Sequence, residues 1–179
     1  LDFGDAPANG IRTPRLAREL GVEATMVPLI WSLLESAPGV FDGPQVPFLR
    51  GINDDLAADG FVVHLAVSPI VQDQLTLPAD LAQAVSQGTI RFNDPPFIAR
   101  FNRLLDFIHG ALPDLPVVTL DIGQEADRYL DVQPDPQFWS DFLQFLWQVS
   151  PHAKSLWGAQ LSVSVNATHR GLVAGPTAS

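Results

Sequence analysis

Short apolar runs alternate with amphipathic segments along most of this chain. Runs of this kind, rich in β-branched residues, are typical of strands buried on both faces. The expected strands cover residues 22–29, 61–67, 117–122 and 161–165. Between the runs, apolar residues recur every three to four positions and predict helices that pack one face against the strands. Prolines near their starts and glycines after several of their ends bound these helices. We expect them at residues 13–20, 47–59, 78–87, 94–110 and 135–156, the last restarting at Pro151.

This alternation of strand and helix predicts an α/β fold with parallel strands and helices on the outer face of the sheet. The 179 residues fit one domain, which we place over residues 1–179. The dipeptide Phe3-Gly4 could end one more strand at the amino terminus. A closed eight-stranded β/α barrel has about 250 residues and needs at least about 200, so the chain is too short for a complete one.

Composition excludes several classes of function. Twenty acidic against ten basic residues give a formal charge of −10, which repels the phosphates of nucleic acids and anionic membrane surfaces. The sequence has no cysteine, so disulfides, thiol catalysis and thiolate metal sites are ruled out. No apolar run approaches the roughly 20 residues of a membrane span. We therefore expect no nucleic-acid partner and no membrane span.

The chain begins at Leu1, with neither a basic segment nor an apolar segment of the kind that makes a signal peptide. We expect it to be a processed or excised product. Removal of an export signal is one explanation, and excision from a longer protein is another. The first explanation favours an extracellular or periplasmic location.

The strongest candidate for chemistry is a glutamate just beyond the third expected strand. The run 117–122 stops at Gly123 and is followed by Gln124-Glu125. Barrel enzymes place catalytic groups where their strands end, and a carboxyl group half sheltered there can stay protonated near neutral pH and donate a proton. The alternative is a structural one, because acidic residues after a strand often favour the dipole at a helix start.

The segment from Asp121 to Leu130 resembles the acid/base strand of retaining glycoside hydrolases with (β/α)8 barrels. That large clan usually carries Asn-Glu where this chain has Gln124-Glu125. Other segments follow in the order of the clan, including a strand that leads into Trp31, Glu35 and a Pro-Gly-aromatic turn. The similar segments are residues 26–42, 60–65, 92–105, 121–130 and 154–168. The resemblance spans nearly the whole chain and makes the expected strands the second to fifth of a partial TIM-barrel-like fold.

The resemblance implies a secreted hydrolase of carbohydrate metabolism that degrades polysaccharides or oligosaccharides with retention at the anomeric carbon. Glu125 would be its general acid/base, and Gln124 would stand in for the asparagine that hydrogen-bonds the sugar 2-hydroxyl. The nucleophile of the clan is a glutamate at the end of the seventh strand. This chain has no identifiable equivalent of it, so whether the chain is an enzyme by itself stays open. The resemblance implies neither a metal nor a cofactor.

Further residues are assigned to the substrate site by their positions after strands. Trp31 ends the first strand, where its ring could stack on a sugar or could equally cover the core. Asn166 and His169 follow the last strand and could reach a ligand. His64, flanked by apolar residues, is expected to be a satisfied core histidine, and Glu35 is expected to cap the Pro-Gly turn that follows it.

A second interpretation comes from a different functional class. The chain could be a non-catalytic module, derived from a glycosidase barrel, that binds carbohydrate or assembles with another chain. A third is a purely structural fragment. Whichever holds, a partial barrel leaves an open sheet edge and a half-covered inner face, so we expect a second chain or the missing half of the barrel to cover them. Sequence motifs for phosphate loops, serine-nucleophile elbows and zinc-binding helices are absent.

Overall fold

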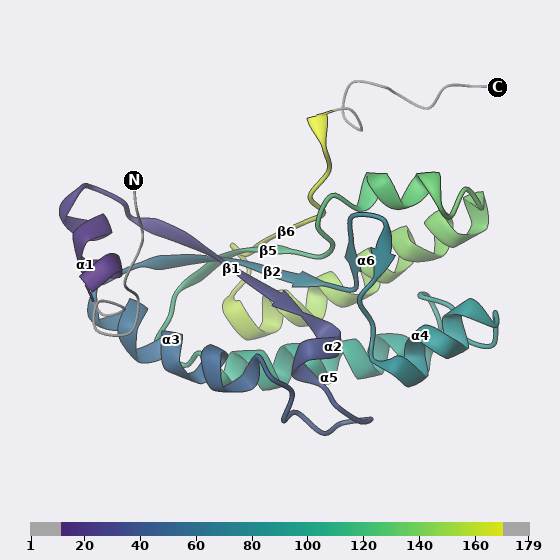
Figure 1. Ribbon diagram of the computed structural model, residues 1–179, viewed down its shortest axis with the longest axis horizontal. Coiled ribbons are helices and arrows are strands. Elements are labelled where there is room, and N and C mark those ends of the chain that lie inside the picture. The colour runs from purple at the N-terminus through teal and green to yellow at the C-terminus, as the bar shows by residue number, and fades with distance from the viewer. Residues whose placement is uncertain (1–11, 170–179) are drawn as a thin grey trace.

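The computed structural model describes residues 12–169 and contains one four-stranded parallel sheet (Figure 1). The strands are ordered β1 (Ala24–Ile30), β2 (Val62–Ser68), β5 (Val117–Asp121) and β6 (Ser162–Ser164). Each neighbouring pair is parallel, so the expected α/β fold with parallel strands is confirmed. The suggested strand end at Phe3-Gly4 lies outside the described residues.

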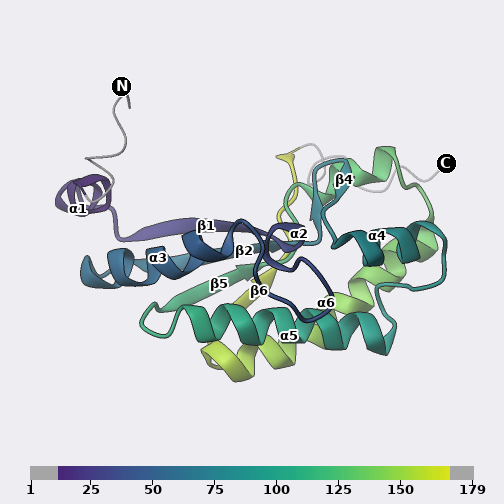
Figure 2. The ribbon, with the colours of Figure 1, turned by 60° about the horizontal axis from the view of Figure 1, so that its bottom comes forward.

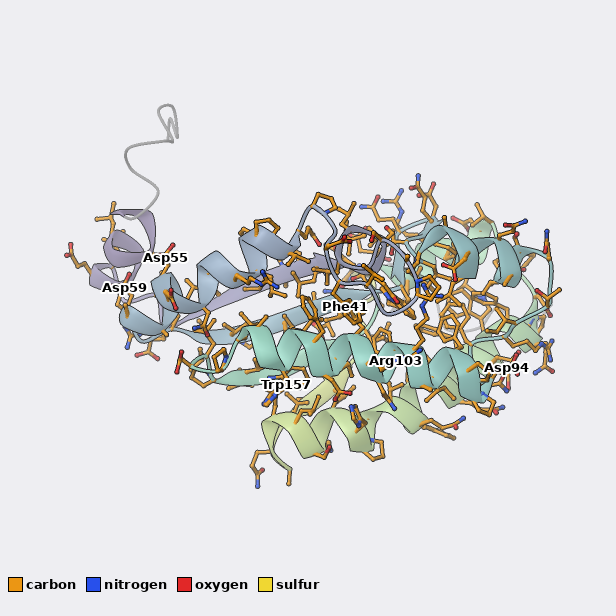
Figure 3. All side chains as sticks on the ribbon, turned by 90° about the horizontal axis from the view of Figure 1, so that it is seen from below. Phe41, Asp55, Asp59, Asp94, Arg103 and Trp157 are labelled. Carbon is orange, nitrogen blue, oxygen red and sulfur yellow. The ribbon has the colours of Figure 1, made fainter. Side chains whose placement is uncertain are left out.

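Three helices cover one face of this sheet. They are α3 (Val46–Ala58), α5 (Pro95–Ala111) and α6 (Pro136–Trp157), and they lie side by side beneath the strands (Figures 2 and 3). Two shorter helices, α1 (Arg12–Glu19) and α4 (Ala79–Ser86), lie at opposite ends of the sheet. Layers of this kind place the helices where the outer ring of a barrel would be.

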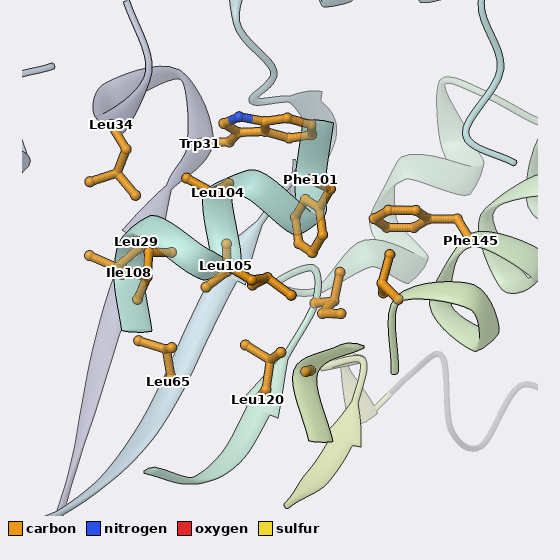
Figure 4. Packing of buried hydrophobic residues seen from close by; sticks show 14 of the residues in the cluster. Leu29, Trp31, Leu34, Leu65, Phe101, Leu104, Leu105, Ile108, Leu120 and Phe145 are labelled. Carbon is orange, nitrogen blue, oxygen red and sulfur yellow. The ribbon is translucent and has the colours of Figure 1, made fainter. Parts of the chain in front are cut away.

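The core lies between the sheet and its three helices. Every second strand residue points toward the helices, since side chains alternate along a strand, and Leu29, Leu65 and Leu120 are fully buried. They meet the apolar stripe of α5, which supplies Leu104 and other residues of its buried face (Figure 4). Burying an aliphatic side chain of this size contributes roughly 1.5–3 kcal/mol, so this layer contributes substantially to the stability of the described part.

The opposite face of the sheet carries no helix among residues 12–169 (Figure 1). It presents Met26, whose exposed fraction is 52%, and a hydrogen bond of 2.7 Å between His64 Nδ1 and Thr119 Oγ1. Asp121 and Ser164 are also hydrogen-bonded. His64 is therefore satisfied as expected, but on the open face rather than in the helix-covered core. In a closed barrel this face would be the interior.

Three elements were not anticipated from the sequence. A short helix, α2 (Trp31–Leu34), directly follows β1, and a hairpin of β3 (Ile70–Val71) and β4 (Gln74–Leu75) follows β2. A 3-10 helix, η1 (Ala126–Asp131), follows β5. All three lie at the carboxyl end of the strands, so they shape the surface where barrel enzymes carry their chemistry.

The expected restart at Pro151 is wrong, because α6 continues through it as one helix. An internal proline removes one hydrogen bond and costs about 3 kcal/mol. The buried side chains of Val149 and Ala153, on either side of the proline, pack against the core and offset that cost. Although α6 is long, no helix among residues 12–169 is long and apolar enough to cross a membrane.

Candidate active site

Glu125 occupies a strained turn at the carboxyl end of β5. Gly123 leaves the strand with a φ of 103°, and Glu125 itself has a φ of 49°, in the left-handed region. A residue with a side chain held in that region costs about 1 kcal/mol or more, and such positions cluster at functional sites. The strain therefore needs surrounding contacts that hold the turn.

The hairpin after β2 holds one side of this turn. The backbone N–H of Gln124 donates to the Ile70 carbonyl at 2.9 Å, and the N–H of Gln72 donates to the Gln124 carbonyl at 2.8 Å. Residue 124 is thus paired as though it belonged to a strand beside β3. Glu125 follows directly after this fixed point.

The segment after β6 holds the other side. The Asn166 N–H donates to the Gly123 carbonyl, and the Ala126 N–H donates to the Asn166 carbonyl, both at 3.1 Å. Two residues farther along, the Thr168 N–H donates to Asp127 Oδ1 at 2.7 Å and its hydroxyl donates to Oδ2. Burial alone would raise the pKa of Asp127, but these Thr168 hydrogen bonds outweigh it and lower the pKa. The backbone of Glu125 is consequently anchored from both sides.

The side chain of Glu125 reaches solvent. Its exposed fraction is 36%, and Oε2 lies 3.5 Å from Nη1 of Arg128, one turn of η1 away. A contact of that length at a partly exposed site is weak, so the carboxylate stays accessible to a ligand.

The structure brings three of the five sequence-predicted site residues together. Gln124, Glu125 and Asn166 are joined through the backbone contacts given above. The side chain of Gln124 is half-buried and makes no hydrogen bond within residues 12–169, so its amide is free to contact a ligand. His169 is exposed and lies three residues beyond Asn166.

The structure contradicts the substrate-stacking role of Trp31. Its side chain has an exposed fraction of 0% and packs edge-on against the rings of Phe97 and Phe101, with centroids 5.4 and 5.2 Å away. Its indole N–H donates to Glu35 Oε2 at 2.6 Å. Position 31 is the first residue of α2, which turns the ring toward the helices and away from the open face. The core alternative therefore holds.

Glu35 belongs to a buried charged network that the sequence reading did not find in full. Oε1 accepts from the Gly39 N–H at 2.6 Å, which confirms the predicted turn cap, and from Arg100 Nε at 3.0 Å. Arg100 also binds Asp80 with its two terminal nitrogens. The sequence contained one sign of this network. Arg100 lies within the apolar stripe of α5, and an arginine at a buried position needs charged or polar partners.

The network sets the charge states of its members. The Arg100 hydrogen bond holds the pKa of the half-exposed Asp80 carboxyl below its usual value. Burial would lower the pKa of Arg100, but hydrogen bonds to Asp80 and Glu35 raise it. The network therefore ties α4 to the loop after α2. Within the described residues it has no contact with Glu125.

A metal ion in a protein is held by several neighbouring carboxylate or imidazole side chains. Within residues 12–169, no group of three or more His, Asp or Glu side chains could hold one. Of the two acidic side chains at the turn, Asp127 is hydrogen-bonded to Thr168, and Glu125 has only the long contact with Arg128.

Comparison with known proteins rests on structure, because no family model and no curated protein sequence matches this chain. GH5_18 from Bifidobacterium longum subsp. longum has a TM-score of 0.65 at 20% identity, over 90% of this chain and 40% of its own. The exo-β-1,4-mannosidase from Opitutaceae bacterium strain TAV5 has a TM-score of 0.67 at 16% identity, over 92% and 29%. A variant of GH5_18 from Streptomyces cattleya, in complex with Manb1-4GlcNAc, has a TM-score of 0.63 at 17% identity, over 90% and 40%.

These likenesses cover nearly all of this chain but two fifths or less of each of the three enzymes. At such low identity they establish the fold. They confirm the expected partial barrel, with parallel strands and outer helices. This chain therefore has the fold of one part of a (β/α)8-barrel glycoside hydrolase.

Proposed function

We propose that this chain is the acid/base-bearing part of a retaining glycoside hydrolase, which further strands complete into an active barrel. Its reaction is hydrolysis of O-glycosidic bonds in oligosaccharides or polysaccharides. One observation carries the proposal. Glu125 sits in a strained turn at the carboxyl end of β5, anchored from both sides, in a fold that this chain shares with part of a glycoside hydrolase.

In this proposal Glu125 acts twice. First, its protonated carboxyl group donates a proton to the glycosidic oxygen as the bond from that oxygen to the anomeric carbon breaks. A nucleophilic carboxylate, roughly 5–5.5 Å away and supplied by a strand outside this chain, forms the glycosyl-enzyme bond. The Glu125 carboxylate then takes a proton from water, which attacks the anomeric carbon and releases the nucleophile.

Gln124 is proposed to bind the sugar 2-hydroxyl beside the reacting carbon. Its backbone is fixed by the hairpin at Ile70 and Gln72, while its side-chain amide makes no hydrogen bond within residues 12–169. Glutamine is one methylene longer than the asparagine usual at this position, so the sugar ring must sit correspondingly farther from β5. A displacement of about 1 Å matters for rate, and this pocket must therefore differ in shape from those with asparagine.

The first substrates to test are β-linked mannosides. An exo-β-1,4-mannosidase and a GH5_18 variant in complex with Manb1-4GlcNAc are among the proteins that share this fold. The half-exposed carboxyl group of Glu125 at the end of β5 is compatible with a substrate that enters from the carboxyl end of the strands.

A second candidate is a non-catalytic carbohydrate-binding or assembly module. The open face of the sheet favours it, since Met26 is 52% exposed there and β1 has an unpaired edge in the described part of the chain. A second chain on that face would complete the layer without supplying a nucleophile. The two candidate functions differ in one measurable property, because only the hydrolase cleaves the glycosidic bond of its ligand.

The test uses the protein in which further strands accompany this chain, assayed on aryl β-mannosides and on Manβ1-4GlcNAc. Glu125→Ala should lower kcat on the disaccharide by about 10²–10⁴-fold with an unchanged circular dichroism spectrum. Asp131→Ala is the matched control and should retain activity, because Asp131 is an exposed acid at the far end of the 3-10 helix that follows Glu125. Sugar binding without turnover by the unmodified protein would instead establish the binding module.

A further inference from the structure

A separate pocket is lined by residues of α4, of the loop after it and of the start of α6. These segments lie close together at one end of the molecule (Figure 2). The volume of the pocket is about 330 Å³, at the lower end of the range for small-ligand sites. The chain reaches it directly from the candidate active site, because η1 leads from Glu125 to Gln133, one of its lining residues. The proposed hydrolysis assigns this pocket no role.

The central side chain of the pocket is Arg91, which is held in place by contacts with two aspartates. Its backbone N–H donates to Asp94 Oδ2 at 2.7 Å, and Nε of Arg91 lies 3.3 Å from Oδ2 of Asp141. The Asp141 side chain is only 4% exposed and also accepts from Gln137 at 2.7 Å, whereas the Arg91 side chain is 51% exposed. Within residues 12–169 the two terminal guanidinium nitrogens have no hydrogen-bond partner. A buried carboxylate thus orients an arginine whose remaining donors have no partner in the described part of the chain.

Two more polar side chains around the pocket have hydrogen-bonding atoms without a partner in the described residues. The side-chain amide of Gln87 makes no hydrogen bond within the described residues, and Asp135 uses one carboxylate oxygen to cap α6 and leaves the other open. Val85, Ile90 and Phe138 contribute apolar surface. The pocket therefore presents donors, acceptors and an apolar wall together.

We infer that this pocket binds a small neutral carbohydrate, as a second sugar site distinct from the Glu125 site. Sugar hydroxyls both donate and accept hydrogen bonds, so they can satisfy Arg91 and Asp135 at once, while the C–H face of the ring rests on the apolar wall. Asp135 and Asp141 outnumber Arg91 in a chain of net charge −10, which disfavours anions. Two carboxylates, one of them already paired, are too few ligands for a metal ion.

The test is a titration of the isotopically labelled 179-residue chain with mannose, N-acetylglucosamine and Manβ1-4GlcNAc, followed by amide chemical shifts. We expect saturable changes at residues 86–92 and 133–138, with a dissociation constant in the millimolar range. Arg91→Ala should weaken binding by about tenfold or more, the loss of one charged hydrogen-bonding group. Arg103→Ala is the matched control, because Arg103 is exposed on α5 away from the pocket (Figure 3), and it should bind like the unmodified chain.

Several outcomes would overturn the inference. These are no saturable change at the pocket amides, equal affinity in the Arg91 and Arg103 variants, or tighter binding of inorganic phosphate at the same amides. Should Arg91→Ala lose its dispersed amide spectrum, Gln87→Ala, at an exposed rim residue, takes its place with the same criterion. Glu125→Gln should leave the pocket titration unchanged, so failure of the proposed hydrolysis and failure of this site are distinguishable.

Discussion

The backbone N–H of Gln72 donates to the carbonyl of Gln124 at 2.8 Å. This hydrogen bond joins the tip of the β3–β4 hairpin to the turn that carries Glu125. The bond matters because Gln72 itself has left-handed backbone, with a φ of 56°, and Gln124 directly precedes Glu125, whose φ is 49°. Proton transfer needs a catalytic group placed to within about 1 Å, and a turn paired on both sides can provide that.

Strain at Glu125 can be measured by comparing glycine with alanine at this position. Glycine adopts a positive φ without steric cost, whereas alanine carries the same penalty as glutamate. We therefore expect Glu125→Gly to be more stable than Glu125→Ala by about 1 kcal/mol in urea unfolding. At Glu23, an exposed residue without a positive φ, the same pair should show the usual order, with alanine at least as stable as glycine. If alanine were at least as stable as glycine at position 125 as well, residue 125 would not be strained.

The buried network around Glu35 should be sensitive to the loss of its arginine. Arg100→Leu would leave the Glu35 carboxylate, 1% exposed, without its charged partner, and an uncompensated buried charge costs about 3–5 kcal/mol. The free energy of unfolding should fall by that amount. Arg103→Leu, on the exposed side of the same helix, should change it by no more than about 0.5 kcal/mol. Similar small losses in both variants would mean that water reaches Glu35.

Asp127 should make the stability of the site depend on pH. Its pKa is raised by burial but lowered overall by the Thr168 hydrogen bonds, to below the usual value of 3.8. A lowered pKa in the folded state means that the contribution is present above about pH 4 and is lost as the pH falls through the folded pKa. Asp127→Asn should therefore lower the unfolding free energy at pH 7 by about 1 kcal/mol and make the loss of stability below pH 4 shallower.

The control for this pH dependence is Asp131→Asn. Asp131 is exposed at the end of the same 3-10 helix, so its replacement should leave both the value at pH 7 and the acid limb unchanged. Unfolding by urea at pH 7, 5 and 3 measures all three proteins. Parallel acid limbs for the unmodified chain and the Asp127 variant would contradict a lowered pKa at this carboxyl group.

The open face of the sheet should drive association. Met26 lies on that face and Leu143 lies on α6, and both are 52% exposed, so they are a matched pair. Met26→Glu should reduce concentration-dependent association in sedimentation velocity, because a charge would have to be buried in the contact. Leu143→Glu should not. A monomer at every concentration tested would remove the need for a partner on this face.

Much of the fold could be predicted because local signals and packing agree in it. The run from Val117 to Ile122 is apolar, ends at a glycine with positive φ, and became β5 as expected. The helix starts predicted from a proline in the first turn, at Pro95 and Pro136, were also confirmed. In each case the same residues set the local conformation and the buried face.

The site was less predictable because its contacts are between distant segments. Trp31 was placed at the right strand end, but the direction of its ring depends on α2 and on Phe97 and Phe101, which the local sequence does not encode. The β3–β4 hairpin has only two residues in each strand, too few for a periodic signal. Its pairing with Gln124 follows from the parallel order of β2 and β5.

The most direct measurement of the central claim compares Glu125→Gln with the unmodified protein on two substrates, in the protein that includes the completing strands. An aryl mannoside with an activated leaving group needs little protonation, so glycosyl-enzyme formation on it should persist, while activity on Manβ1-4GlcNAc should fall by about 10²-fold or more. Azide, which attacks the intermediate without base assistance, should restore turnover on the aryl substrate and yield the β-mannosyl azide. Equal loss on both substrates with no azide rescue, or full activity of the variant, would contradict Glu125 as the acid/base.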